Sequence, residues 1–317
     1  MAPDRYDVTV IGEEPWGNYN RIMLSPVLSG EKTIDDIMLH PHAWYSDKGI
    51  KFIADDPAIK IDRTRKTVHT EKGESVDYDR LIIATGSKPF IPPVQGVDLK
   101  GVISFRDIYD VNTMIKYCET KKNAVVIGGG LLGLEAAYGL KQRGMNVTVL
   151  HLMDRIMERQ LDGRASRMLR QSIEEKGINI ITEANTEALI GKDGHVNQVR
   201  LKDGTVLDAD LVVFAVGIRP NITLAQSAGL RCNRGILVND TMQTFDPSIY
   251  AVGECIEHRN QTFGLVEPLW GQAFICATHL AEHGSLTFKS PTVPTQLKVS
   301  GVDVFSAGNF EPKEDYE

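Results

Sequence analysis

The sequence predicts an α/β protein of two domains built on parallel β-sheets. The chain has 317 residues, which corresponds to about two domains of ordinary size. Short runs of β-branched residues alternate with stretches of helical periodicity, a pattern typical of parallel strands joined by right-handed crossovers. With 42% hydrophobic and 24% charged residues, the chain also has the composition of a globular protein with an ample core.

The elements follow from hydrophobic runs and from the glycine and proline residues between them. Strands are expected at residues 6–11, 50–54, 81–85, 124–127, 147–151, 178–182, 210–216 and 249–252. Helices are expected at 107–120, 131–143, 163–176 and 270–282, and hairpins at 67–76 and 195–206. The proline-rich residues 88–96 predict a connection between domains. From residue 290 the pattern changes, and we expect the chain to stop inside a third, β-rich unit.

Charge, hydropathy and cysteine content exclude several classes of function. The 35 Lys and Arg residues against 42 Asp and Glu residues give a formal net charge of −7, which argues against nucleic-acid or anionic-membrane binding. No apolar run approaches the roughly 20 residues that span a bilayer, and the N-terminal residues do not resemble a signal peptide. The four cysteines are scattered, which argues against disulfides, zinc and iron–sulfur ligation. We therefore expect a cytoplasmic protein.

The most specific motif is a glycine-rich turn between an apolar strand and a helix. Gly128, Gly130 and Gly133 occupy the positions of a GxGxxG motif in the sequence AVVIGGGLLGLEAA. In such a motif the first glycine makes the tight turn and the second lets the backbone approach a pyrophosphate. The third lets the helix pack on the strand, while the helix N-terminus stabilises the phosphate charge. The context of strand, turn, helix and second strand therefore predicts a dinucleotide site.

The strand after this helix ends at an unusual residue. The acid that binds the adenine ribose of NAD is expected at its end, but the sequence has His151 there, with Asp154, Arg155 and Arg159 following. His151 is either a strand-end surface residue or a residue that sets nucleotide specificity. The sequence leaves the choice between NADH and NADPH open.

Three further segments are consistent with a second nucleotide cofactor. The strand at 81–85 leads into Thr85-Gly86, and the strand at 210–216 leads into Gly217. Gly253-Glu254 follows another strand, where the acid can accept hydrogen bonds from sugar-alcohol hydroxyls. We expect Glu267-Pro268 to precede a helix that begins near Trp270 and points its N-terminus at a flavin.

The order of these segments resembles the FAD-dependent pyridine nucleotide–disulfide oxidoreductases over nearly the whole chain. The resemblance implies that Thr85-Gly86 and Gly253-Glu254 lie at FAD and that residues 128–135 bind NAD(P)H. It also implies that Glu135 lies near the nicotinamide. Residues 12–28, 151–162 and 263–268 are most similar to the flavin module of assimilatory NAD(P)H nitrite reductase large subunits. In that family electrons pass from NAD(P)H through FAD to an iron–sulfur cluster and sirohaem, where nitrite becomes ammonium.

The sequence departs from the family pattern at both ends. We expect the FAD domain to lack its first βα unit with its own GxGxxG motif, and the chain to end before the cluster and sirohaem domains. The usual FAD-ribose acid aligns near Gly12, which leaves Glu13 or Glu14 as its substitute. Arg21 either stabilises anionic reduced flavin or forms a surface salt bridge, and Trp270 either shields the flavin or packs at the start of a helix.

The predicted function is an FAD-dependent NAD(P)H oxidoreductase module with a redox partner as acceptor. FAD is assigned to residues 1–105 with 245–287, NAD(P)H to 106–244, and an interface domain to 288–317. The alternatives are a stand-alone ferredoxin or rubredoxin reductase and a flavin-free nucleotide-binding fragment. Neither a catalytic side chain nor a metal site is predicted, and the oligomeric state stays open, with a homodimer as one alternative. The predicted cofactor-binding residues are Glu13, Glu14, Arg21, Thr85, Gly86, Gly128, Gly130, Gly133, Glu135, Gly217, Gly253, Glu254 and Trp270.

Overall fold

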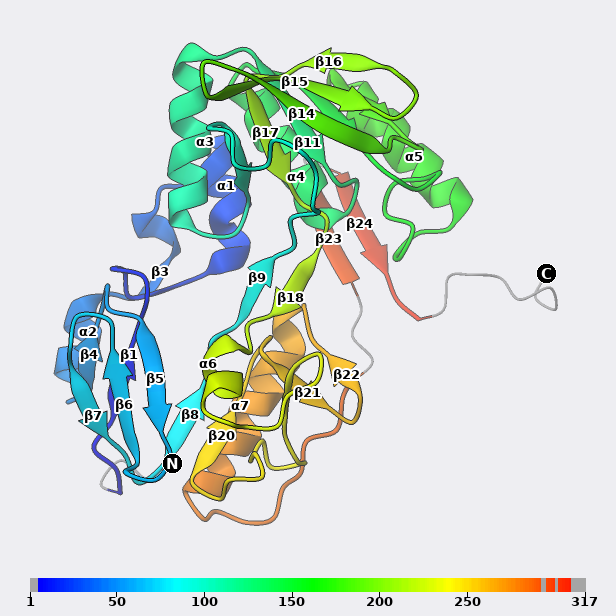
Figure 1. Cartoon of the computed structure of the whole chain (residues 1–317). Helices are drawn as coiled ribbons and strands as arrows, with labels where there is room; N and C mark the ends of the chain where they lie inside the picture. Colours follow the sequence, from blue (N-terminus) through cyan, green and yellow to red (C-terminus); the bar gives the residue numbers. More distant parts are fainter. Residues whose placement is uncertain (1–4, 292–294, 300–301, 309–317) are drawn as a thin grey trace. The chain divides into compact units, whose positions relative to one another are not determined.

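The computed structural model describes residues 5–291, 295–299 and 302–308, which fold as two compact units. Among these residues, unit 1 comprises 5–19, 38–88 and 218–291, and unit 2 comprises 20–37, 89–217, 295–299 and 302–308 (Figure 1). The domains predicted above divide the chain by cofactor, and their boundaries stay a prediction. Part of the predicted interface domain, residues 309–317, lies outside the described residues.

Unit 2 is built around a five-stranded parallel sheet with the strand order β10-β17-β11-β12-β13. These strands are β10 (Val102–Ser104), β11 (Asn123–Ile127), β12 (Asn146–Leu150), β13 (Ile178–Ile181) and β17 (Leu211–Phe214). All four residues of β17 and the last four of β11 are buried, as expected for central strands covered on both faces. This sheet confirms the expected parallel α/β arrangement.

The helices of unit 2 begin where the sequence offers a cap or a glycine turn. They are α1 (Leu24–Ser29), α3 (Ile108–Thr120), α4 (Leu131–Gln142) and α5 (Gly163–Glu174), with short 3-10 turns at Arg21–Met23 and Asp35–Ile37. Asp107 caps α3 by accepting a hydrogen bond from the Asp110 amide, and Asp162 caps α5 in the same way. Helix α1 packs closely on α4, because a Cβ atom at Gly139 would lie 2.6 Å from the Leu28 side chain.

Antiparallel strands complete unit 2. The strands β14 (Thr186–Lys192), β15 (His195–Leu201) and β16 (Val206–Asp208) form one sheet, and β23 (Thr295–Val299) pairs with β24 (Val302–Ser306). The β15–β16 pair confirms the hairpin expected at 195–206.

Unit 1 contains several small sheets around one apolar core. Two parallel pairs, β1 (Thr9–Ile11) with β4 (Lys51–Ile53) and β8 (Leu81–Ile83) with β20 (Ile249–Ala251), lie beside an antiparallel meander. The meander is β5 (Ala58–Asp62), β6 (Thr67–Thr70) and β7 (Ser75–Asp77). The other strands are β2 (Asn18–Tyr19), β3 (Met38–His40), β9 (Ser87–Pro89), β18 (Ile218–Pro220), β19 (Ile236–Leu237), β21 (Ile256–His258) and β22 (Gln261–Thr262).

Three helices pack in unit 1, namely α2 (His42–Asp47), α6 (Thr223–Ser227) and α7 (Val266–Leu280). The expectation that α7 begins near Trp270, after Glu267-Pro268, is wrong, because the helix already begins at Val266. Pro268 is compatible with the first helical turn, where its missing N–H group costs no intrahelical hydrogen bond. Glu267 in the same turn interacts favourably with the helix dipole.

Candidate functional site

The glycine loop of unit 2 connects β11 to α4, and its glycines have different environments. Gly128 has a φ of 124°, and a Cβ atom there would lie 2.3 Å from the carbonyl oxygen of Ala215. A Cβ atom at Gly133 would lie 1.9 Å from the carbonyl oxygen of Gly128. No described atom lies within 4 Å of a Cβ atom built at Gly130. The fold therefore requires the first and third glycines, whereas Gly130 faces open space.

The loop lies at the point where the strand order of the sheet reverses. From β11 the chain continues through β12 to β13 on one side, whereas β17 and β10 lie on the other. Ligands of open α/β sheets bind at the carboxyl ends of the strands at such a point. Gly217, which follows β17, also faces open space and has a φ of 110°. No side chain of the described chain caps the N-terminus of α4 at Gly130, so its first N–H groups are available to an anion.

Glu135 lies in the second turn of α4 and is hydrogen-bonded to α1. The Ser25 hydroxyl donates to a Glu135 carboxylate oxygen at 2.5 Å. Burial raises the pKa of Glu135, and the hydrogen bond from Ser25 partly opposes that effect. The sequence analysis did not identify Ser25, because its partner lies far away along the chain.

His151 is 8% exposed, so the interpretation of this histidine as a surface residue is wrong. It directly follows β12, and its ring packs against Gly129, where a Cβ atom would lie 2.8 Å from the His151 side chain. Gly129 is thus a third position at which the glycine loop admits no side chain.

In unit 1, Thr85 and Gly86 bond to the segment that follows β18. The Thr85 hydroxyl donates to the Asn221 carbonyl oxygen at 2.7 Å, and the Asn221 amide donates to the Gly86 carbonyl oxygen at 2.9 Å. Gly86 has a φ of 63°, which glycine adopts without steric cost. These bonds fix the turn after β8.

Gly253 and Glu254 follow β20, the strand paired with β8. Gly253 has a φ of 93° and faces open space, and its amide donates to the side-chain oxygen of Gln272 at 2.7 Å. Glu254 accepts a hydrogen bond from the Ser87 hydroxyl at 2.7 Å. Gln272 is fully buried, and its side-chain nitrogen has no partner among the described residues. Nothing in the sequence around Ser87 and Gln272 indicated these roles.

The remaining predicted residues are distributed over both units. Glu13 is exposed, whereas Glu14 accepts a hydrogen bond from the Tyr19 hydroxyl at 2.7 Å. Arg21, in unit 2, donates to the Arg106 carbonyl oxygen at 2.8 Å. Trp270 is 68% exposed on α7, so it does not pack at the start of that helix.

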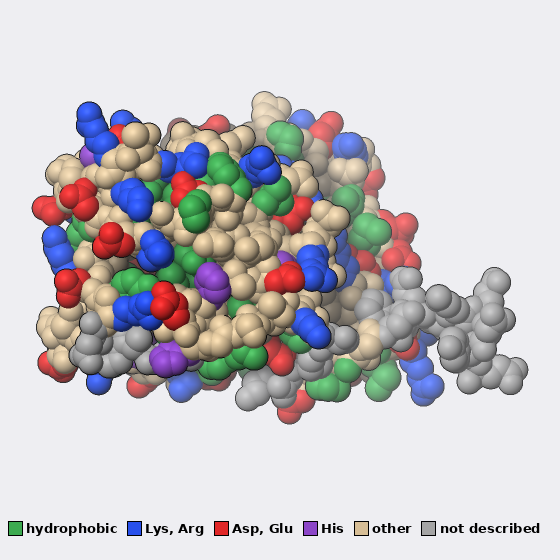
Figure 2. Space-filling model, turned by 90° about the horizontal axis from the view of Figure 1, so that it is seen from below, with side chains coloured by type: hydrophobic (Ala, Val, Ile, Leu, Met, Phe, Trp, Pro, Cys, Tyr) green, Lys and Arg blue, Asp and Glu red, His purple; other side chains and the backbone are tan. Residues whose placement is uncertain are grey.

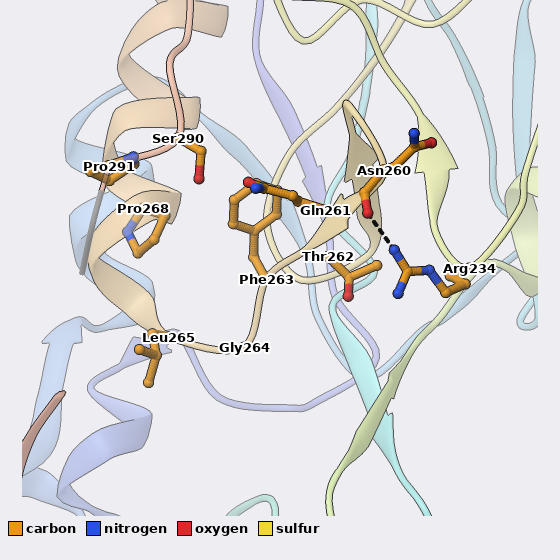
Figure 3. Close-up of a pocket in the computed structure, with 10 residues that line it drawn as sticks. All are labelled: Arg234, Asn260, Gln261, Thr262, Phe263, Gly264, Leu265, Pro268, Ser290 and Pro291. Carbon is orange, nitrogen blue, oxygen red and sulfur yellow. Dashed lines mark hydrogen bonds between the residues drawn. The ribbon is translucent and has the colours of Figure 1, made fainter. Parts of the chain in front are cut away.

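A hollow of about 510 Å³ lies between the β21–β22 hairpin and the start of α7 (Figure 3). Its lining residues are Arg234, Asn260, Gln261, Thr262, Phe263, Gly264, Leu265, Pro268, Ser290 and Pro291. Arg234 crosses one end and donates a hydrogen bond to the Asn260 carbonyl oxygen. None of the predicted cofactor-binding residues lines this hollow.

The surface carries charges of both signs. Lys, Arg, Asp and Glu side chains are interspersed with apolar ones on the face shown in Figure 2. Within the described part of the chain, no helix combines the length and apolar character needed to cross a membrane.

The residues around Gly130 and Gly253 fit nucleotide cofactors. Gly130 combines open space with the uncapped N-terminus of α4, the arrangement that accepts a pyrophosphate. Gly253 combines open space with the neighbouring carboxylate of Glu254, a group that can accept hydrogen bonds from hydroxyls.

Comparisons with known proteins give the same result. Residues 1–273 match the model of the pyridine nucleotide-disulphide oxidoreductase family. The chain is 50% identical over 315 residues to the NAD(P)H nitrite reductase of Bacillus subtilis (strain 168), covering 99% of this chain and 39% of that protein. It is 44% identical to the assimilatory nitrate reductase electron transfer subunit of the same organism, covering 98% of this chain and 40% of that protein. The chain thus spans about two fifths of these relatives.

Solved structures show the same fold. The NAD-dependent persulfide reductase from A. fulgidus is 30% identical with a TM-score of 0.91, over 98% of this chain and 60% of that one. The ferredoxin reductase for the CYP199A2 system from Rhodopseudomonas palustris is 27% identical with a TM-score of 0.86, over 93% of this chain and 74% of that one. These matches confirm the predicted family, the α/β fold, and an oxidoreductase that uses FAD and NAD(P)H.

Proposed function

The chain belongs to the pyridine nucleotide-disulphide oxidoreductase family, and from this premise we propose that it is the electron-entry module of a nitrite reductase. In this proposal electrons pass from NAD(P)H through FAD to a sirohaem and iron–sulfur centre that lies in another part of the protein. The observation that carries the proposal is the 50% identity to an NAD(P)H nitrite reductase over 99% of this chain.

Each unit has a defined task in this proposal. In unit 2, Gly130 admits the NAD(P)H pyrophosphate to the N-terminus of α4, and Glu135, bonded to Ser25, lies near the nicotinamide. In unit 1, Gly253 and Glu254 hold the ribityl–pyrophosphate part of FAD, and Thr85-Gly86 forms the neighbouring turn. FAD supplies the step from two-electron hydride donors to one-electron acceptors. The chain's own residues bind and orient, which is why no acid–base side chain is assigned.

The other predicted FAD contacts are part of the same proposal. Glu13, which is exposed, is a better candidate for the FAD ribose than Glu14, whose carboxylate accepts from Tyr19. Trp270 is exposed and is assigned to cover the flavin, and Arg21 to stabilise the anionic reduced flavin. The protein is proposed to be cytoplasmic, with a redox centre as its partner.

A second candidate is a reductase that donates electrons to a small redox protein. The fold similarity to the ferredoxin reductase described above favours this alternative. Both candidates require the same NAD(P)H and FAD sites, and they differ only in the electron acceptor.

Reconstitution with FAD tests the proposal and separates the candidates. The purified chain is incubated with FAD, excess flavin is removed, and NADH is added without oxygen. We expect the flavin bands near 450 nm to bleach, and electrons to reach the cluster of a separately produced sirohaem–cluster region of the nitrite reductase. Electron transfer to a ferredoxin or rubredoxin, with none to the cluster, would favour the second candidate. Saturable NADH binding without bound flavin would contradict both and identify a nucleotide-binding fragment.

A further inference from the structure

The segment after β12 folds onto the glycine loop of unit 2. The Gly129 amide donates to the Nδ1 atom of His151 at 3.0 Å, and the Met157 amide donates to the Gly129 carbonyl oxygen at 3.0 Å. Met157 has a φ of 54° and is 1% exposed, so its left-handed conformation is held by packing. Both backbone groups of Gly129 are therefore tied to this segment.

These bonds fix the tautomer of His151. Because Nδ1 accepts a hydrogen bond, the ring hydrogen is on Nε2, which lies 3.1 Å from a carboxylate oxygen of Glu158. In this arrangement the imidazole donates to Glu158 and orients its carboxylate.

The second carboxylate oxygen of Glu158 forms an ion pair with the exposed Arg159. It lies 3.7 Å from the Nε atom of Arg159, which is beyond hydrogen-bond distance, and the Arg159 side chain is 85% exposed. The Glu158 side chain is 23% exposed and so reaches solvent. The other cation of the segment, Arg155, lies 3.8 Å from Asp154.

Two apolar side chains directly after His151 are exposed, Leu152 by 61% and Met153 by 48%. Exposed apolar side chains beside a polar group are what an adenosine requires, because its base is flat and apolar on both faces and its ribose is polar.

We propose that Glu158, positioned by His151, binds the adenosine ribose hydroxyls and makes this site selective for NADH over NADPH. The ribose of a dinucleotide lies at the carboxyl end of the strand that β12 represents, and an acid there accepts hydrogen bonds from the 2′-hydroxyl. His151 occupies that strand end. Its ring donates to the carboxylate of Glu158, seven residues later, and so holds an acid close to the strand end. A 2′-phosphate is repelled by this carboxylate. This inference rests on one part of the proposed function, namely that unit 2 binds the nicotinamide dinucleotide.

Equilibrium binding tests the inference without catalysis. Dissociation constants are measured by calorimetry for NADH, NADPH, 5′-AMP and 2′,5′-ADP, the last two of which carry only the adenosine end. For the wild-type chain we expect NADH to bind at least about 10-fold more tightly than NADPH, and 5′-AMP more tightly than 2′,5′-ADP. The substitution Glu158→Gln keeps the shape but removes the charge, and it should reduce both preferences at least about fivefold.

A matched control is Glu187→Gln, which removes the carboxylate paired with Arg200 on another sheet of unit 2. It should leave all four constants unchanged. The inference is wrong if the wild-type chain prefers NADPH or if Glu158→Gln leaves the NADPH-to-NADH ratio within twofold of wild type. Absence of binding by both dinucleotides to the wild-type chain would instead contradict the proposed function, and the inference with it.

Discussion

A substitution at Gly130 should weaken nucleotide binding while leaving the fold intact. This glycine is the N-cap of α4, with a φ of −86° and a ψ of −176°, a conformation that alanine adopts readily. A Cβ atom there meets nothing within 4 Å, whereas one at Gly133 would lie 1.9 Å from the Gly128 carbonyl oxygen. Gly130→Ala and Gly133→Ala are thus chemically identical changes with different expected consequences.

The magnitudes follow from these environments. Alanine at an N-cap costs about 0.5–1 kcal/mol relative to glycine, and the reduced freedom of the unfolded chain returns about 0.4–1 kcal/mol. Gly130→Ala should therefore change the free energy of unfolding by less than about 1 kcal/mol. Gly133→Ala forces α4 away from the β11 turn, because its methyl group would meet a backbone atom, at a cost of about 1–3 kcal/mol.

Urea unfolding and NADH calorimetry on both variants test this reasoning. Gly130→Ala should weaken NADH binding at least about 10-fold with unfolding unchanged, because its methyl group occupies the space of the pyrophosphate. Gly133→Ala should instead lower the free energy of unfolding. Wild-type NADH affinity in a folded Gly130→Ala variant would refute the assignment of the second glycine.

Three further outcomes are expected. Burial and the neighbouring Asp107 raise the pKa of Asp110 to about 6, so the wild type should lose stability as the pH rises from about 4 to 6. In urea titrations, Asp110→Asn should remove up to about 3 kcal/mol of that loss. An unchanged dependence of the free energy of unfolding on pH would contradict this prediction. Glu257 is 1% exposed and accepts three hydrogen bonds, so Glu257→Ala should lower the free energy of unfolding by about 3 kcal/mol, and a loss below about 1 kcal/mol would count against this. Ser25→Ala removes the bond that lowers the pKa of Glu135, so the pH profile of flavin reduction should shift upward in pH, whereas an unmoved profile would separate Glu135 from the reaction.

The parallel sheet of unit 2 and its glycine loop could be predicted because their signals are local. The strand β11 and the helix α4 follow directly from an apolar run, a glycine turn and a helical period within one stretch of sequence. Helix α7 was expected to begin too late, because proline was interpreted as preceding the helix and not as part of its first turn.

Long-range partners could not be predicted. The bonds from Ser25 to Glu135 and from Ser87 to Glu254 join residues 110 and 167 positions apart, and no local pattern encodes such pairs. The pairing of His151 with Glu158 is short in sequence but depends on the left-handed Met157, a conformation that the sequence does not indicate. These contacts therefore depend on how distant segments pack together, which local sequence patterns do not reveal.

The most direct test of the central claim is the anaerobic absorbance of the FAD-reconstituted chain on addition of NADH. The account predicts bleaching near 450 nm in the wild-type chain, and at least about 10-fold slower bleaching at limiting NADH in a folded Gly130→Ala variant that retains its flavin. Bound flavin that NADH fails to reduce in the wild-type chain would contradict the account. Equal reduction in both proteins would show that the hydride donor binds elsewhere than the glycine loop.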